Sequence, residues 1–422
     1  MQIAIIQKPH TVKLLGAFCR DERGIVLITA LLFLMVLTVL GTTAIVISST
    51  DIKIGGNYKL SKQAFYDAEA GIQYAIKNIE NGLAAETLSL TGSSIAVNYT
   101  APSGFSFDPI TTLTQVGSTS NYSFQATGHA ANNTSSAIEV VIKRDTLLNY
   151  GIFGDDEIDM KNSGAAYSYD SRVTPNPTPA DSTGEADIGS NEHVITHNGT
   201  IVDGDIALGE DESGNDAVYE EHGGSPGPTV TGVEGVDVDR VNPDPLGAIG
   251  GDLATTFSTV SSGSNDNVWG GITGNTINLG NGDTMILYGK AGGADYYVTD
   301  ITLHNGATLN IDATAGPVNI YLTGGLDAKN GSAVNITGMP PDFTIYSNST
   351  DKIDFKHGSA FKGTVYAPYA PVDMKNSSAV YGLIWANTVD IKNSGQFFFD
   401  TALKDKFASD DISIVSWREV RE

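Results

Sequence analysis

Uncharged, mostly apolar residues run without a break from Ile25 to Ile47. At about 1.5 Å per residue, a helix of this length crosses the roughly 30 Å hydrocarbon layer of a membrane. Basic residues precede the run and Asp51 follows it, so the positive-inside bias places the N-terminus in the cytoplasm and the bulk of the chain outside. A secretory signal fits less well, because its apolar region is usually about 7 to 15 residues and ends at a small-x-small cleavage site.

The pattern becomes amphipathic beyond this run. Apolar side chains recur at helical spacing, which indicates a helix with one apolar stripe, at Phe65, Ala68, Ile72, Ala75, Ile76 and Ile79. We therefore expect a single helix over residues 25–82, apolar all round in its first half. Gly55 and Gly56 are its weakest point, since each costs about 1 kcal/mol in a helix interior.

Two segments between residues 83 and 147 alternate apolar and polar residues, NYSFQATGHA and SSAIEVVIKRD. A period of two is typical of half-buried strands, and the Asn-rich residues between the segments predict a turn. Residues 83–147 are therefore expected to form a small β region, a stalk that joins the helix to a C-terminal head.

A short motif recurs through the rest of the chain, as IDMKNSG from Ile158, ITLHNGA from Ile301, LDAKNGS from Leu326, IDFKHGS from Ile353, VDMKNSS from Val372 and VDIKNSG from Val389. Self-similarity at a period of about 20 residues indicates a solenoid, because one unit cannot bury its own apolar side and must stack on a neighbour. Within a unit, Ile353 and Phe355 would point inward and Asp354 and Lys356 outward.

The predicted fold is therefore mainly β, with a right-handed parallel β-helix as the head over residues 148–405 and a C-terminal strand or tail over residues 406–422. The chain would turn at each Asn-Gly or Asn-Ser pair, and strands would stack about 4.8 Å apart. Columns of Asp and Lys would run down one face. Equivalent turn residues would form a corner ladder of Asn162, Asn305, Asn330, His357, Asn376 and Asn393.

Charge and composition limit the kinds of partner that the chain can bind. The net charge of −25 excludes nucleic acid, because phosphate binding needs a basic face. Cys19 is the only cysteine, so no intramolecular disulfide and no Cys-ligated metal is expected. The acidic excess is concentrated between Asp155 and Asp244, and we interpret residues 174–264 as longer loops around the early coils.

Candidate chemistry is sparse. Parallel β-helices include polysaccharide-cleaving enzymes, which need clustered carboxylates in a groove. In most repeats, however, Lys follows the outward Asp by two residues, which would neutralise the column by lateral pairing. A ladder repeated in every coil is typical of a scaffold, so we predict no enzyme activity and no cofactor.

Metal ligands are equally few. His193 and His197 would lie about 13 Å apart along a strand, too far to share one ion. The loop DGDIALGEDESGND supplies many carboxylates but lacks EF-hand spacing, so a solvated loop is the preferred interpretation. Its members are weak calcium candidates at most: Asp203, Asp205, Asp211 and Asp216.

The junction Arg23-Gly24-Ile25, a charged leader that ends in glycine before the apolar run, resembles the site cut by prepilin peptidases. The run itself, followed by GGN, QAF and AEAGI, is similar to the N-terminal segment of PilX-type minor pilins. This resemblance implies that residues 1–24 are removed as a leader. It also implies that the helix first anchors the subunit in the inner membrane and later packs in a filament core, through Thr29, Phe65, Ile72 and Ile76.

Thr29 stands where most pilins have glutamate. As the resemblance implies, that glutamate pairs with the N-terminal amine of the subunit assembled just before it. A threonine hydroxyl can instead bond to a carbonyl one helical turn earlier. Loss of the pairing favours a place at the filament tip, and a shaft subunit held by apolar packing alone is the competing interpretation.

The stretch KGTVYAPYAPVDMKNSSAVYGLIWANTVDIKNSGQFFFDTAL, with NYGIFG from Asn149, resembles a β-solenoid domain of unknown function often found behind PilX-type N-termini. The prediction is thus a non-catalytic minor pilin-like subunit of a type IV pilus or secretion pseudopilus, whose head serves assembly, priming or adhesion. Expected partners are prepilin peptidase, other pilins, the pilus assembly machinery, the inner membrane before assembly, and a surface or carbohydrate ligand. The alternative is an exported, membrane-anchored β-helix that binds or acts on carbohydrate.

Overall fold

A computed structural model describes residues 22–85, 87–90, 93–117 and 121–420. Cys19 and most of the predicted leader lie outside these residues. The chain divides into two compact units: unit 1 comprises Met1–Arg144 and Asp410–Glu422, and unit 2 comprises Asp145–Ser409. The chain therefore passes twice between the units.

Helix α1 (Glu22–Ala84) runs without interruption through both halves of the predicted segment and through the Gly55-Gly56 pair. Its first half exposes its apolar side chains, for example Phe33 at 70% and Ile45 at 71%. In its second half one face is buried, because the apolar stripe read from the sequence packs against a sheet. The helix thus has an unpartnered apolar half and a half that belongs to a domain core.

That sheet has five strands in the order β1-β2-β3-β4-β27. Its members are β1 (Ser94–Tyr99), β2 (Ile110–Gln115), β3 (Asn121–Ala130), β4 (Thr134–Thr146) and β27 (Ala408–Val420). The first four pair as antiparallel neighbours. The fifth strand comes from the far end of the sequence and lies at the edge beside β4.

Helix α1 approaches strand β3 closely at Gly128. A Cβ atom at this position would lie 2.1 Å from the Ala64 carbonyl oxygen and 2.3 Å from the Ala68 nitrogen. Ala64 and Ala68 are themselves fully buried. Small residues on both elements therefore bring the helix against the sheet, and Ile72 and Ile79 fill the core beside them.

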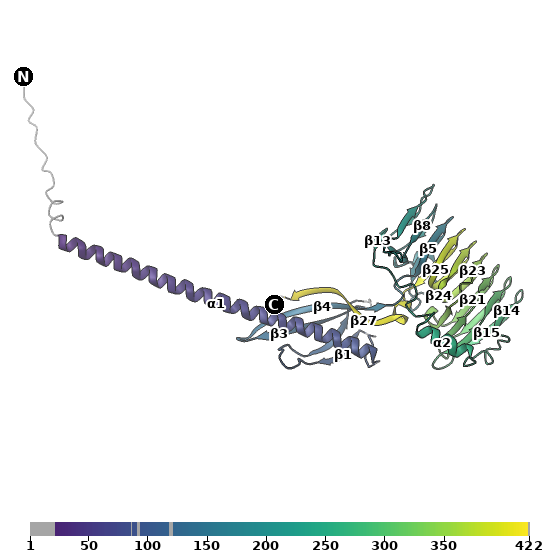
Figure 1. Ribbon diagram of the computed structural model, residues 1–422, viewed down its shortest axis with the longest axis horizontal. Helices are drawn as coiled ribbons and strands as arrows, with labels where there is room; N and C mark the ends of the chain where they lie inside the picture. Colours follow the sequence, from purple (N-terminus) through teal and green to yellow (C-terminus); the bar gives the residue numbers. More distant parts are fainter. Residues whose placement is uncertain (1–21, 86, 91–92, 118–120, 421–422) are drawn as a thin grey trace, which may run out of the picture. The chain divides into compact units, whose positions relative to one another are not determined.

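Unit 2 consists of short strands in parallel stacks (Figure 1). The strands that come first in the chain are β5 (Ile152–Lys161), β6 (Ala165–Tyr169), β7 (Ile188–Ser190), β8 (His193–Thr196), β9 (Ile201–Val202), β10 (Ile206–Leu208), β11 (Val218–Glu221), β12 (Thr229–Val230) and β13 (Val236–Asp237). The later strands are β14 (Thr276–Leu279), β15 (Thr284–Tyr288), β16 (Ala294–Val298), β17 (Asp300–Leu303), β18 (Thr308–Asp312), β19 (Val318–Leu322), β20 (Leu326–Ala328), β21 (Ala333–Thr337), β22 (Phe343–Ser347), β23 (Ile353–Lys356), β24 (Ala360–Lys375), β25 (Ala379–Lys392) and β26 (Gln396–Asp400).

Each strand from β14 to β21 pairs in parallel with the strand three positions further along the chain, and the long strand β24 also pairs with β22 and β23. Thus β14 pairs with β17, β15 with β18 and β16 with β19, and the same step continues through β20, β21 and β22. Three strands therefore complete one coil. This arrangement confirms a solenoid-like parallel sheet, and the right-handed sense of the coil stays a prediction.

The coils do not stack in chain order. Strand β5 pairs with β25 and strand β6 with β26, so the first strands of unit 2 lie directly on the last ones. Strands β7 to β9 stack on the other side of β5 and β6, and strands β10 to β12 follow them. The last strands thus lie between two groups that precede them in sequence.

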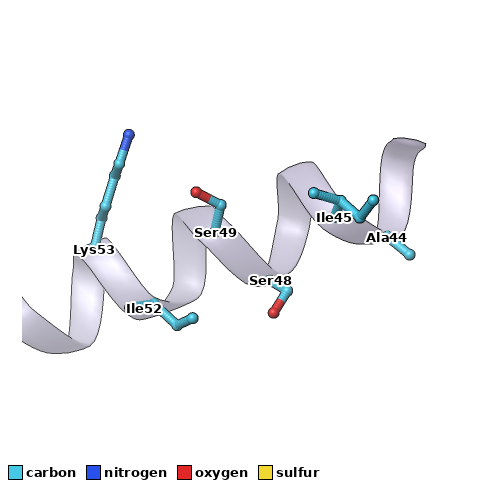
Figure 2. Close-up of a pocket in the computed structure, with 6 residues that line it drawn as sticks. All are labelled: Ala44, Ile45, Ser48, Ser49, Ile52 and Lys53. Atoms are coloured by element: carbon cyan, nitrogen blue, oxygen red, sulfur yellow. The ribbon is translucent and has the colours of Figure 1, made fainter. Parts of the chain in front are cut away.

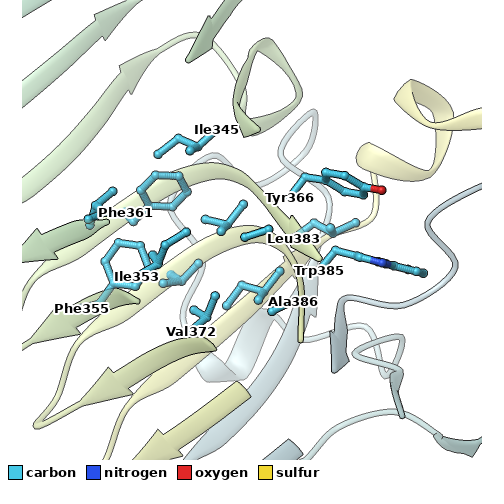
Figure 3. Close-up of a cluster of buried hydrophobic side chains, with 14 of the residues drawn as sticks. Ile345, Ile353, Phe355, Phe361, Tyr366, Val372, Leu383, Trp385 and Ala386 are labelled. Atoms are coloured by element: carbon cyan, nitrogen blue, oxygen red, sulfur yellow. The ribbon is translucent and has the colours of Figure 1, made fainter. Parts of the chain in front are cut away.

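The interior of unit 2 is a continuous apolar core. The predicted inward residues Ile353 and Phe355 are both fully buried, and Figure 3 shows them among side chains from neighbouring coils. Helix α2 (Asp252–Ser261) packs outside the coil, where Phe257 lies edge-on to Tyr321 at 5.3 Å. The remaining short helices are η1 (Pro179–Asp181), η2 (Pro340–Asp342) and α3 (Leu403–Lys406).

We predict that Met374→Asp destabilises unit 2 by several kcal/mol, because it places an unpaired charge in a fully buried position between Phe355 and Ile391. Met374→Leu is the matched control, since a swap of similar volume usually costs under about 1.5 kcal/mol. Thermal unfolding of the full chain measures both changes. Equal shifts for the two variants would contradict the inward placement of this residue.

Candidate functional site

The exposed half of α1 is the first candidate surface. An 18-residue window in this helix has a mean hydropathy of 2.7, and none of it is buried. By length and composition the helix can therefore cross a membrane. One candidate pocket lies on this half of the helix. All of its lining residues come from α1: Ala44, Ile45, Ser48, Ser49, Ile52 and Lys53. Figure 2 shows them spread along and around the helix, so they enclose no cavity.

Threonine hydroxyls in α1 bond to the helix itself. The Thr29 hydroxyl donates to the carbonyl oxygens of Ile25 at 2.9 Å and Val26 at 3.0 Å, as expected from the sequence. The other four threonines of the helix bond in the same way, at Thr38, Thr42, Thr43 and Thr50. No threonine of α1 therefore presents an unpaired hydroxyl to hydrocarbon or to another helix.

The other three residues predicted to pack in a filament core lie in the second half of α1. Ile72 and Ile76 are 1% and 9% exposed, inside the core of unit 1. Phe65 packs edge-on against Trp417 at 5.7 Å. These three side chains fasten the helix to its own sheet, so the open apolar surface of α1 is the segment from Ile25 to about Ile54.

The corner residues of the solenoid meet in part. Asn162 donates to Asn393, and Asn393 to Asn376, both at 2.9 Å; Asn376 Nδ2 lies 3.0 Å from His357 Nε2. Each of these four residues has a positive φ. Through the bond between Asn162 and Asn393, the ladder joins two coils whose residues lie 231 positions apart in sequence.

Asn330 and Asn305 occupy the equivalent turns without joining this ladder. Neither side chain makes a hydrogen bond to another described residue. At both turns the positive φ falls on the following glycine, Gly331 or Gly306. The backbone nevertheless continues the stack, because Gly306 N–H donates to the Asn330 carbonyl at 2.9 Å and Gly331 N–H to the His357 carbonyl at 2.9 Å.

Acidic and basic columns run side by side on one face of unit 2. Strand register aligns five carboxylates in one column, from Asp327 through Asp354, Asp373 and Asp390 to Asp159. Lysines two residues further on reach across to them. Lys375 Nζ, for example, lies 2.5 Å from an Asp373 oxygen and 3.4 Å from an Asp354 oxygen. Lys356 and Lys375 thus bind carboxylates within and between coils, whereas Lys161, Lys329 and Lys392 each bind the carboxylate of their own coil.

Three of these outward-pointing carboxylates are nevertheless largely covered. Asp159, Asp354 and Asp373 are only 6%, 7% and 6% exposed. They do point away from the apolar core, but strands stacked on either side and the lysine side chains above cover them. Burial alone would raise the pKa of Asp373, yet hydrogen bonds from Lys352 and Lys375 hold it below its ordinary value.

Three of the four calcium candidates already accept hydrogen bonds. Asp203 accepts from Thr231 at 2.6 Å, Asp205 from the Val233 N–H at 2.7 Å, and Asp211 from Ser213 and Asn215. Asp216 lies opposite Glu210 in an isolated bridge. Within the part of the chain that the structure describes, no group of three His, Cys, Asp or Glu residues could hold a metal ion.

One cluster of histidines was not predicted from the sequence. His197 stacks on His222 with ring centroids 4.8 Å apart, and its Nε2 lies 3.3 Å from an Asp159 oxygen. His193, four residues before His197, lies on the neighbouring Glu157 instead. Only the parallel pairing of β8 with β11 brings the two stacked rings together, and their separation in sequence gave no signal of it.

Comparison with known proteins found two family models, which match different parts of the chain. Residues 23–73 match a family model described as PilX N-terminal. The chain carries a PilX-type N-terminal region. Residues 294–406 match a domain of unknown function, DUF7305, so the two resemblances read from the sequence are confirmed for these ranges.

The PilX-type region contains the open apolar half of α1 and the start of its buried half. The DUF7305 match contains strands β16 to β26 but none of β5 to β13, which stack on its last coil. Comparison with curated proteins gave no match.

Two solved structures align with low scores. The competence-associated pilin ComZ from Thermus thermophilus is 14% identical, with a TM-score of 0.27, over 86% of this chain and 98% of that chain. An ice-binding DUF3494 domain from Shewanella frigidimarina is 14% identical, with a TM-score of 0.24, over 61% of this chain and 96% of that chain. At such TM-scores neither likeness assigns a fold or an activity.

We predict that Asp373→Asn destabilises unit 2 by about 1–2 kcal/mol, because a buried carboxylate loses its pairing with Lys352 and Lys375. Asp327→Asn, at the 36% exposed end of the same column, should cost less than about 1 kcal/mol. Since the folded pKa of Asp373 is lowered, its contribution is complete above the ordinary pKa of 3.8 and disappears as pH falls through the folded value.

Thermal unfolding at neutral pH and at about pH 3 tests this ranking. An equal loss for Asp373→Asn and Asp327→Asn at neutral pH would show that burial of the column does not strengthen its pairing.

Proposed function

We propose that this chain is a non-catalytic minor subunit of a type IV pilus or a related pseudopilus. The observation that carries the proposal is the division of α1. Its first half is a continuous open apolar surface, and its second half is built into the core of unit 1. A helix of this design can be embedded in a membrane and later embedded among other helices without refolding the domain behind it.

The PilX-type match over residues 23–73 supports the same role. Before assembly, the apolar half would hold the subunit in the inner membrane, with the sheet of unit 1 and all of unit 2 outside the cytoplasm. After assembly, the same surface would pack against the helices of other pilin subunits in the pilus. Prepilin peptidase and the pilus assembly machinery are the partners that this sequence of events requires.

A structural role for the head is supported by the Asp and Lys columns. Each carboxylate of the column is paired with lysine, and the same pairing recurs in successive coils. A catalytic pair of carboxylates needs one member whose environment differs from the other. The repeated pairing makes the column a lateral support of the solenoid, and we propose that the head acts by display rather than by chemistry.

The second candidate is an exported, membrane-anchored β-helix that binds or acts on carbohydrate without entering a filament. The large β-solenoid of unit 2 favours it, since such a head exceeds what filament packing needs. Dependence of surface display on the filament machinery separates the two. Display that persists without the assembly machinery would favour the second candidate.

The mature chain is expected to begin at Ile25, because Gly24 ends a charged leader directly before the apolar run. Intact mass spectrometry of the protein from cells with active prepilin peptidase measures this directly. A Gly24→Leu variant is the control and should keep the leader. If the unmodified chain also retains residues 1–24, the pilin role is excluded.

Thr29 predicts the position of the subunit. Its hydroxyl donates to the Ile25 carbonyl oxygen within the same helix. Unlike glutamate, threonine has no carboxylate that could pair with the N-terminal amine of a preceding subunit. A carboxylate left unpaired there would cost about 2.5–3.5 kcal/mol in hydrocarbon. We therefore expect a label on unit 2 to appear at filament ends in few copies.

Imaging of labelled filaments checks this placement, with a label on a major subunit as the control for access along the shaft. Regular labelling along the shaft through unit 2 would contradict it. Thr29→Glu should then be compared, because a restored carboxylate is expected to move some label into the shaft.

A further inference from the structure

One face of unit 2 carries asparagine side chains that make no hydrogen bond to another described residue. Strands β15, β18 and β21 form it, and the residues between its outward positions, such as Leu309 and Ile311, are fully buried. Parallel register sets two outward columns beside each other, namely Ile286, Asn310 and Asn335, then Tyr288, Asp312 and Thr337.

The two asparagines of this face are free. Asn310 and Asn335 are register partners on neighbouring strands, yet neither amide has a hydrogen-bond partner among the described residues. The corner asparagines of the same solenoid behave differently, because Asn393 and Asn376 bond to each other at 2.9 Å. Amides that sit in register without bonding leave donors and acceptors available to a ligand.

An exposed aromatic pair borders the face. Trp269 and Tyr288 are 52% and 42% exposed, and Ile286 beside them is 41% exposed. The two ring centroids are 6.0 Å apart, with the planes tilted by 52°. Exposed large apolar groups in one place are informative, since isolated ones are common but clusters mark binding sites. Neither the Trp269 indole N–H nor the Tyr288 hydroxyl bonds to any described residue.

These groups define the chemistry of the ligand. Aromatic rings pack against the C–H faces of sugars, while amide and carboxylate groups bond to hydroxyls. The Thr314 hydroxyl and N–H hold the pKa of Asp312 below its ordinary value, so this carboxylate is charged at neutral pH. With a net charge of −25 on the chain, an anionic polymer is repelled and a neutral one is not.

We propose that the face formed by β15, β18 and β21 binds a neutral glycan. One sugar ring packs on Trp269 and Tyr288, and the following rings bond to Asn310, Asp312 and Asn335. Strands lie about 4.8 Å apart, a step of the order of one sugar ring, so each strand meets its own part of an extended chain. The site deepens the proposed display role and rests on the head being exported.

The test uses the full mature chain in a detergent without a sugar headgroup. Microcrystalline cellulose, chitin and dextran are the neutral probes, and alginate is the anionic one. The chain is expected to bind at least one neutral glycan and not alginate. Trp269→Ala should weaken this binding about tenfold or more, and Asn310→Ala or Asn335→Ala about fivefold each.

Trp417→Ala is the matched control, because Trp417 is a comparably exposed tryptophan, at 45%, in unit 1. It should leave binding unchanged, and thermal unfolding of every variant verifies that it is folded. Absence of binding to all three neutral glycans overturns the proposal. So do binding to alginate alone and an equal loss in Trp417→Ala.

Incorporation into filaments is followed separately in the same cells. A Trp269→Ala chain that enters filaments normally but has lost glycan binding supports the site. A chain that binds glycan but never enters filaments also supports it, while contradicting the pilus role.

Discussion

Parallel stacking of strands about 4.8 Å apart is the constraint on which unit 2 depends. It places equivalent residues of successive coils directly over one another, so any polar residue that recurs becomes a column. A column of like charges destabilises a sheet unless an opposite column lies beside it. The Asp and Lys columns solve this together, since Lys375 reaches both Asp373 and Asp354. The corner asparagines also link successive coils, because their uncharged amides hydrogen-bond to each other.

The same constraint permits a coil order unlike the chain order. The pairing of β5 with β25 keeps Asp159 over Asp390 and Lys161 over Lys392, so the columns continue where the chain does not. The long segment between β13 and β14, residues 238–275, makes this order possible. Asp244 fixes it to the solenoid, because its carboxylate accepts hydrogen bonds from Tyr366 at 2.5 Å and Tyr369 at 2.6 Å.

Satisfied and unsatisfied polar groups divide the surface of unit 2 by role. Where Asp and Lys or the corner asparagines bond to each other, little remains for a ligand, and the columns hold the coils in place. Where Asn310 and Asn335 stay unbonded beside an exposed Trp269, the polar groups remain available. Likewise in unit 1, the buried stripe of α1 is structural and its open apolar half is available to a membrane or to other helices.

The sequence by itself determined the local features, because they depend on periods a few residues long. The apolar run, the amphipathic stripe, the inward Ile353 and Phe355 and the turns at Asn376 and Asn393 all follow from such spacing. Only the tertiary structure decided which distant segments meet. It set β27 beside β4, β5 beside β25 and His197 beside His222, and it buried Asp373, because covering a side chain requires neighbours that spacing along one chain does not identify.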